Sequence, residues 1–149
     1  MQAIIFIGIQ GAGKSTFFKE RFYDTHIRIN LDMLRTKHRE KVLIEACLEA
    51  KQPFVIDKTN PTREARAGYI ERARLYKFSV AGYYFASDLA EAIERNKRRA
   101  GRANVPEKAI VATYNRLEIP ALSEGFDELF YVKSDEAKGF TAEEWRDEI

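Results

Sequence analysis

The chain has 149 residues, of which 45% are apolar and 32% are charged, and its formal net charge is +2. That length suits one domain, and the composition excludes disordered, collagen-like and low-complexity proteins. No apolar run reaches the roughly 18 to 20 residues that span a bilayer, and the apolar start leads into glycines and a lysine rather than a cleavage site. We therefore expect a cytoplasmic protein without membrane contact.

Apolar runs of strand length alternate with longer segments of helical period, which is typical of a parallel sheet with crossover helices. The predicted strands are residues 3–7, 26–29, 54–56, 80–85 and 129–132. The predicted helices are residues 14–23, 39–50, 63–76, 88–99 and 107–117, with Ser87 and Thr62 as helix caps and Pro106 at a first helical position. No repeat or flexible linker interrupts this pattern, so we predict one α/β domain over residues 1–149.

The first predicted strand runs directly into GIQGAGKS, which matches the phosphate-binding pattern G-x-x-x-x-G-K-[ST] between a strand and a helix. Its glycines allow backbone N–H groups to turn toward phosphate oxygens, and the following helix adds the positive end of its dipole. Lys14 is predicted to reach the β and γ phosphates, and the Ser15 hydroxyl to ligate Mg²⁺. The predicted nucleotide-binding residues of this loop are Gly8, Gln10, Gly11, Ala12, Gly13, Lys14, Ser15 and Thr16. We therefore predict that the chain binds ATP, or another nucleoside triphosphate, together with Mg²⁺.

Polar residues follow the second predicted strand in the segment NLDMLR. In open α/β sheets the functional residues lie beyond the carboxyl ends of the strands, which is where this segment falls. Asp32 could accept a proton from a substrate hydroxyl, and Arg35, three residues further on, could clamp a phosphate. A helix N-cap followed by a solvated arginine is the alternative interpretation of Asp32.

The third predicted strand ends in DKTNP, where Asp57 resembles the last residue of a Walker B strand. A carboxylate at that position orients Mg²⁺ through a water. Thr59 and Asn60 follow in a turn closed by Pro61, where they are candidates for substrate binding. Their side chains could equally satisfy the local backbone, so both interpretations stay open.

Basic residues exceed acidic ones in residues 1–102, whereas acidic residues exceed basic ones in residues 103–149. The densest basic run is RNKRRAGR at residues 95–102, at the end of a predicted helix. Arg95 and Arg99 are four residues apart and share one helix face, and a glycine follows them. We predict a short lid over about residues 95–105 whose two guanidinium groups close over the phosphates, although a solvated helix terminus is also compatible with this run.

The motifs GIQGAGKST, D-x-x-R at Asp32 and Arg35, DKTNP, REARAGYIERAR, RNKRR and IPALSEGFDEL occur in this order and span most of the chain. Together they resemble the polynucleotide 5′-hydroxyl kinase family of P-loop phosphotransferases. The resemblance implies that Asp32 is the general base, that Arg35 clamps the acceptor's phosphate and that Arg95 and Arg99 are the lid arginines. It also implies an adenylate-kinase-like P-loop fold, with a parallel sheet of four or five strands flanked by helices and a short helical lid.

We therefore expect an ATP-dependent kinase that transfers the γ-phosphoryl group to a hydroxyl, with Lys14, Asp32 and Arg99 as its catalytic residues. The expected acceptor is the 5′-hydroxyl end of DNA or RNA, or a nucleoside 3′-phosphate. The predicted acceptor-binding residues are Arg35, Asp57, Thr59 and Asn60, and Ser15 and Asp57 are the predicted metal site. Two alternatives stay open, namely a kinase of a small metabolite or antibiotic and a non-catalytic ATP-binding switch.

Overall fold

The computed structural model of the chain describes residues 1–86, 88–99, 105–135 and 139–146. The strands are β1 (Gln2–Ile7), β2 (Ile27–Ile29), β3 (Phe54–Ile56), β4 (Ser79–Phe85), β5 (Glu128–Asp135) and β6 (Gly139–Glu144). The helices are α1 (Lys14–Arg21), α2 (Leu31–Leu34), α3 (Lys37–Ala50), α4 (Arg63–Leu75), α5 (Leu89–Lys97) and α6 (Glu107–Arg116), with a 3₁₀ helix at Leu122–Glu124.

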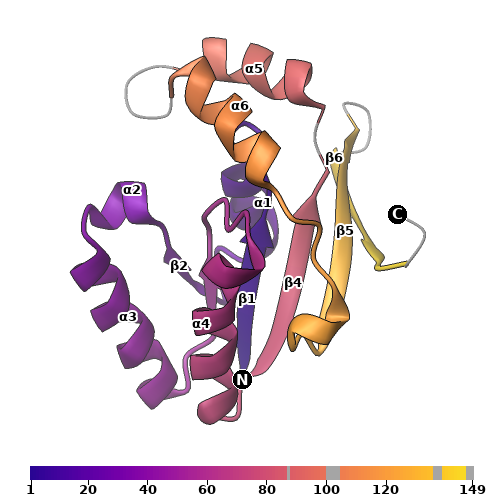
Figure 1. The fold of residues 1–149 in the computed structure, drawn as a ribbon. Helices are drawn as coiled ribbons and strands as arrows, with labels where there is room; N and C mark the ends of the chain where they lie inside the picture. The colour runs from indigo at the N-terminus through magenta and orange to yellow at the C-terminus, as the bar shows by residue number, and fades with distance from the viewer. Residues whose placement is uncertain (87, 100–104, 136–138, 147–149) are drawn as a thin grey trace.

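Within the described residues the strands form one sheet in the order β2-β3-β1-β4-β5-β6. The first five strands of this order pair in parallel, and β6 pairs antiparallel to β5. The carboxyl ends of the parallel strands therefore share one edge of the sheet, and α5, α6 and α2 lie toward that edge (Figure 1). This arrangement confirms the predicted α/β class with its parallel, helix-flanked sheet.

The central strand β1 is apolar along its length because both faces of the sheet are covered. Successive side chains of a strand point to opposite faces. Ile5 and Ile7 pack into a core that includes residues of α3 and α4, whereas Ile4 and Phe6 pack into a second core with Phe17 of α1. A strand that is buried on both faces reads as a continuous apolar run, which explains the AIIFI segment.

Helix starts agree only partly with the sequence predictions. Thr62 caps α4 as expected, because its side chain accepts a hydrogen bond from the Ala65 N–H at 3.1 Å. The predicted cap of α5 was wrong: Asp88 is the N-cap, and its carboxylate accepts from the N–H groups of the second and third helical residues. Ser87, the predicted cap, lies outside the described residues. Pro106 precedes the first helical residue of α6 instead of occupying that position.

Three elements were not predicted: strand β6, helix α2 and the 3₁₀ helix at Leu122–Glu124. The five parallel strands agree with the expected four or five, and strand β6 adds an antiparallel edge that makes the sheet six-stranded. Most of its residues are exposed, which leaves no apolar alternation to detect. Its Phe140 nevertheless packs on Phe17 of α1, with ring centroids 5.5 Å apart, and its carbonyl accepts from Arg21 Nη2 at 2.8 Å. The short helix α2 also went undetected, since four residues are too few to show a helical period.

Arg66 of α4 is completely buried and joins three segments of the chain. Its Nε and Nη2 donate to the two carboxylate oxygens of Glu124 in the 3₁₀ helix, at 2.9 and 3.1 Å. Its Nη1 donates to the Asn60 carbonyl in the β3–α4 loop at 2.9 Å. Glu124 in turn accepts from the Ala121 N–H, so both charged groups of this buried pair have hydrogen-bond partners.

No helix in the described part of the chain has the length and apolar character needed to cross a membrane.

Candidate nucleotide and acceptor site

Two glycines of the loop between β1 and α1 adopt left-handed backbone conformations. The φ angle is +81° at Gly11 and +94° at Gly13, a region that residues with a Cβ rarely occupy. A Cβ on Gly11 would lie 2.6 Å from the Ala92 carbonyl oxygen of α5, and one on Gly13 would lie 2.8 Å from a ring carbon of Phe140. Helix α5 and strand β6 therefore pack directly against the loop, and only glycine fits at these two positions.

Lys14 begins α1 and is only 8% exposed. Its Nζ donates to the carbonyl oxygens of Gly8 and Ile9, at 3.0 and 2.7 Å. Burial lowers the pKa of Lys14 to about 8, while the negative charge of Asp57 opposes this shift and the positive charge of Arg99 adds to it. The ammonium group is thus held within the loop, where phosphate oxygens would compete with the two carbonyls.

Ser15, Asp57 and Arg28 form one polar cluster below the loop. The Ser15 hydroxyl donates to Asp57 Oδ2 at 3.2 Å, and Arg28 Nε donates to the same oxygen at 2.8 Å. Arg28 Nη2 also donates to Ser15 Oγ at 2.7 Å. The Arg28 guanidinium therefore contacts both Ser15 Oγ and Asp57 Oδ2, atoms of the two side chains that were predicted to bind Mg²⁺.

The oxygen donors of Ser15 and Asp57 fit Mg²⁺, which takes one or two protein oxygens together with phosphate oxygens and waters. Within the described residues there is no group of three or more His, Cys, Asp or Glu side chains that could hold a metal. The nucleotide and water would therefore have to supply the remaining ligands. The Arg28 guanidinium lies 2.7 Å from Ser15 Oγ, so we expect Arg28 to move away when a second cation binds to that oxygen.

Helix α2 begins directly after β2 and carries Asp32 in its first turn. Asn30 is the N-cap: its Oδ1 accepts from the Met33 N–H at 3.0 Å, and its Nδ2 donates to the Asp57 carbonyl at 3.0 Å. The alternative interpretation of Asp32 as the helix cap was therefore wrong. Asp32 is exposed, and so is Arg35, which ends α2 with φ +76°. Such a backbone conformation is strained for a residue other than glycine.

A cavity of about 530 Å³ opens at the carboxyl ends of β1, β2 and β3. Residues from the phosphate-binding loop, α2, the β3–α4 loop and the end of α5 line it. The predicted site residues in this lining are Gln10, Gly11, Gly13, Lys14, Ser15, Asp32, Asp57, Thr59 and Arg99. The structure thus brings together the predicted phosphate-binding lysine, the predicted base and one lid arginine.

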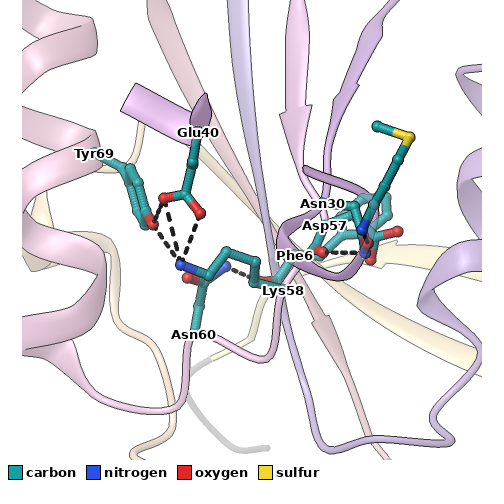
Figure 2. Close-up of polar contacts among 8 residues, drawn as sticks. Phe6, Asn30, Glu40, Asp57, Lys58, Asn60 and Tyr69 are labelled. Atoms are coloured by element: carbon teal, nitrogen blue, oxygen red, sulfur yellow. Dashed lines mark hydrogen bonds and ion pairs between the residues drawn. The ribbon is translucent and has the colours of Figure 1, made fainter. Parts of the chain in front are cut away.

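The other predicted site residues have different surroundings. Asn60 is only 2% exposed and its Nδ2 donates to the Phe6 carbonyl at 2.7 Å, so its amide supports β1 beneath the loop (Figure 2). Ala12 is buried in the core, whereas Thr16 is exposed on α1. Arg35 lies outside the cavity lining. The Gly8 N–H donates to the Thr59 carbonyl at 3.0 Å, which ties the two loops together.

The two predicted lid arginines, Arg95 and Arg99, have different surroundings. Arg95 Nη1 donates to the Gly11 carbonyl at 3.1 Å and its Nη2 donates to Ser134 Oγ at 3.1 Å. Arg99 lies two residues beyond the end of α5 and lines the cavity. Part of the predicted lid, residues 100–104, lies outside the described residues.

Gln10 connects the loop to α6. Its Nε2 donates to Thr113 Oγ1 at 3.1 Å, while its Oε1 is buried and has no hydrogen-bond partner in the described part of the chain. Because Gln10 also lines the cavity, this oxygen is a candidate acceptor for a donor group of the nucleotide.

Sequence analysis missed Arg28 and Lys58. A charged residue between two isoleucines in the three-residue strand β2 is unusual, and this could have indicated a partner for Arg28 in the site. Lys58 directly follows Asp57 beyond the end of β3. The same rule that selected Asp57, a polar residue at a strand end, could therefore also have selected Lys58. Lys58 lines the cavity, and its Nζ contacts Glu40 and Tyr69.

A family model and a curated relative match the sequence of this chain. A family model described as an AAA domain matches residues 4–120. The bifunctional polynucleotide phosphatase/kinase of Schizosaccharomyces pombe is 31% identical over 130 residues, which cover 84% of this chain and 32% of that protein. The chain thus spans about a third of the length of this curated relative.

Solved structures share the fold. Kti12 from Chaetomium thermophilum in complex with ADP-AlF3 has a TM-score of 0.66 and 19% identity, with 91% of this chain and 92% of that chain covered. A gluconokinase from Sinorhizobium meliloti has a TM-score of 0.57 and 17% identity, with 89% of this chain and 82% of that chain covered. At these identities the likeness concerns the fold.

Proposed function

Because the chain belongs to the AAA-domain family and has the fold of P-loop kinases, we propose that it transfers the γ-phosphoryl group of ATP to a hydroxyl group. We further propose that this hydroxyl is the 5′-OH end of DNA or RNA, or that of a nucleoside 3′-phosphate. The observation that carries the proposal is that the exposed carboxylate of Asp32 and the ammonium-bearing Lys14 of the glycine loop line one cavity. The similarity to a polynucleotide phosphatase/kinase supports the acceptor class.

The phosphate-binding loop and α5 would hold the nucleotide. Lys14 would exchange its two carbonyl partners for β and γ phosphate oxygens, and Ser15 and Asp57 would hold Mg²⁺ directly and through water. Mg²⁺, when bound, supplies positive charge to the phosphates. Arg99 would add a guanidinium to the transferring group, while Arg95 would keep α5 against the loop through its contact with Gly11.

Asp32 and Arg35 would hold the acceptor. The Asp32 carboxylate would accept the proton of the attacking hydroxyl as the new bond to phosphorus forms and the bond to the leaving ADP oxygen breaks. Arg35 would contact the phosphate on the 3′ side of that hydroxyl in a charge-assisted hydrogen bond. The side chain of Thr59 also lines the cavity and would help to orient the acceptor.

A small-metabolite acceptor is the second candidate. Leu31 and Met33 line the cavity beside Asp32, whereas Arg35 does not. An apolar wall of this kind would suit a compact substrate without a phosphate group. The likeness to a gluconokinase is compatible with this candidate through the fold alone.

An acceptor panel separates the two candidates. Transfer from γ-labelled ATP is measured with 5′-OH DNA, 5′-OH RNA, nucleosides, nucleoside 3′-monophosphates and sugars. The proposal expects acceptors with a 3′-side phosphate to be favoured over the matching nucleoside. Equal rates with and without that phosphate, or preferred labelling of sugars, would replace it with the small-metabolite candidate.

The variant Arg35→Ala tests the same contact from the protein side. A charge-assisted hydrogen bond contributes about 1.5 to 3 kcal/mol. Removing it should therefore lower the acceptor kcat/KM by about ten- to a hundredfold and leave the KM for ATP unchanged. The matched control is Lys19→Ala, which removes an exposed cation from α1 and should change neither parameter. Loss of ATP affinity in Arg35→Ala would contradict the assigned role.

A further inference from the structure

Asp32 and Arg35 lie in residues 31–35, which we call the acceptor segment. Two neighbouring residues of the β3–α4 loop, Asp57 and Lys58, contact the chain on either side of this segment. Before the segment, Asn30 Nδ2 donates to the Asp57 carbonyl at 3.0 Å. After it, Lys58 Nζ lies 3.2 Å from Glu40 Oε2 in an ion pair. Figure 2 shows Asn30 beside Asp57 and, at a separate place, Glu40 and Tyr69 around the end of Lys58.

Glu40 is placed to fix the start of α3. It lies in the first turn of that helix, where its N–H donates to the Thr36 carbonyl at 3.1 Å, and it is only 6% exposed. Thr36 is also the N-cap of α3 and immediately follows Arg35. A restraint on the Glu40 side chain therefore acts on the backbone next to Arg35.

Tyr69 of α4 completes the cluster. Its hydroxyl donates to Glu40 Oε1, and Lys58 Nζ donates to the hydroxyl oxygen at 2.7 Å. Burial and the neighbouring Glu40 raise the pKa of Tyr69, so the phenol keeps its proton and remains a donor. The Lys58 ammonium thus has an anionic and a neutral partner, although its side chain also lines the cavity.

Restraint on both sides also explains the backbone of Arg35. Its φ of +76° is unfavourable for a residue with a Cβ, and such conformations persist only where the surroundings enforce them. The side chain of Leu34, next to Arg35, packs against the core, and the polar contacts of Asn30 and Glu40 add a restraint on either side.

We propose that Lys58, Glu40 and Tyr69 are positioning residues for the acceptor: they fix the Arg35 end of the segment relative to the phosphate-binding loop. This inference rests on the proposed function. The link runs from Glu40 through Lys58 to the β3–α4 loop, which the Thr59 carbonyl joins to the Gly8 N–H. The acceptor's phosphate and hydroxyl would thereby be held in register with the γ-phosphate.

The chain offers a matched control on the same two helices. Glu45 of α3 accepts from Arg72 Nη2 of α4 at 2.7 Å and lies 3.4 Å from the hydroxyl of Tyr76. This second cluster again joins a carboxylate of α3 with a cation and a tyrosine. It lies five residues further along α3, which is about 7.5 Å along the helix axis at 1.5 Å per residue. Because this second cluster is more exposed than the Glu40 cluster, thermal unfolding of a variant in each cluster is measured in parallel, and only a loss of acceptor activity beyond the loss of stability is assigned to positioning.

The experiment compares Glu40→Gln with Glu45→Gln. The acceptor kcat/KM is measured with and without a 3′-side phosphate, and the KM for ATP is measured in parallel. Glu40→Gln should lower kcat/KM for the phosphate-bearing acceptor by about ten- to a hundredfold, the scale of a small misplacement, and reduce the preference for that phosphate. The KM for ATP should not change. Glu45→Gln should behave like the unmodified protein, and equal losses in the two variants would overturn the inference.

Lys58 provides a second test in case Glu40→Gln weakens the fold. Lys58→Arg, which keeps the charge, should retain most of the acceptor activity, whereas Lys58→Met should lose it to the same extent as Glu40→Gln. Equal activity of the two Lys58 variants would contradict a role for the ion pair.

Hydrogen exchange separates failure of this inference from failure of the proposed function, because it needs no acceptor. The amides of residues 33–36 should exchange faster in Glu40→Gln than in Glu45→Gln, while those of the phosphate-binding loop should not. If the unmodified protein does not phosphorylate polynucleotide 5′ ends, the proposed function fails. The exchange measurement would still show whether Glu40 restrains residues 33–36. Unchanged exchange at residues 33–36 would overturn the positioning role.

Discussion

The nucleotide side and the acceptor side of the cavity are built in different ways. On the nucleotide side, residues 8–15 form a loop whose glycines are covered by α5 and β6 and whose lysine is almost fully buried. On the acceptor side, Asp32 and Arg35 are exposed on a four-residue helix. The lysine is held by carbonyls of its own loop, whereas the segment with Asp32 and Arg35 is held by residues of the distant β3–α4 loop. Substitutions on the nucleotide side should therefore affect transfer to every acceptor, whereas those on the acceptor side should lower turnover and leave ATP binding unchanged.

The largest effect is expected at Lys14, on the nucleotide side. Lys14→Ala should abolish transfer to every acceptor, because the phosphates lose the cation that is held inside the loop itself. The fold should persist, since backbone and glycine geometry shape the loop; circular dichroism and thermal unfolding check this. Retention of half the activity with any acceptor would show that Lys14 does not bridge phosphates.

Asp32→Asn should give the next largest effect, on the acceptor side. Loss of a general base costs on the order of 10² in kcat or more. Binding of ATP, measured by calorimetry, should remain unchanged because the carboxylate serves the attacking hydroxyl. Weaker ATP binding in this variant would instead assign Asp32 to the metal and remove the distinction between the two sides.

Arg99→Ala should lower kcat by about ten- to a hundredfold, the scale of one charge-assisted contact. Arg99→Lys should restore only part of the loss, because lysine supplies the charge without the planar fork of a guanidinium. Arg95→Ala should be milder, since its contacts are with Gly11 and Ser134. Full activity of Arg99→Lys would show that Arg99 contributes only its charge and not the shape of its guanidinium.

The smallest predicted effect is the uptake of protons when ATP binds. In the free protein the pKa of Lys14 is about 8, and nearby phosphates should raise it. ATP binding between about pH 8 and 9 should therefore take up a fraction of a proton, and ATP affinity should fall as the pH rises above 8. Calorimetry in two buffers of different ionisation enthalpy measures the uptake. It should vanish at pH 6.5 and in Lys14→Ala; uptake that persists in the variant would assign it to another group.

The same division explains what the sequence could predict. The strand, glycine loop and helix around Lys14 form one contiguous pattern, so the parallel fold and the cavity-lining position of Lys14 and Ser15 were foreseen. Asp32 and Asp57 were found from their positions at strand ends. These predictions needed only residues close together in the chain.

Other parts of the site depend on contacts between distant residues. Arg28 reaches Asp57 across 29 positions, and Lys58 reaches Glu40 across 18. No local pattern encodes such pairs. Asn60 and Thr59 looked equivalent in the sequence, but only the tertiary packing directs Asn60 inward to Phe6 while leaving Thr59 in the cavity lining. The catalytic and binding roles of these residues stay predictions.

Arg66 has a consequence for how the molecule opens. Its guanidinium cannot lose its charge, so separating it from Glu124 or from the Asn60 carbonyl would leave a buried charge unpaired. Helix α4, the 3₁₀ helix and the loop that carries Asp57 should therefore open as one foldon rather than fray separately. The wall of the cavity, although a loop, would then share the cooperativity of the core.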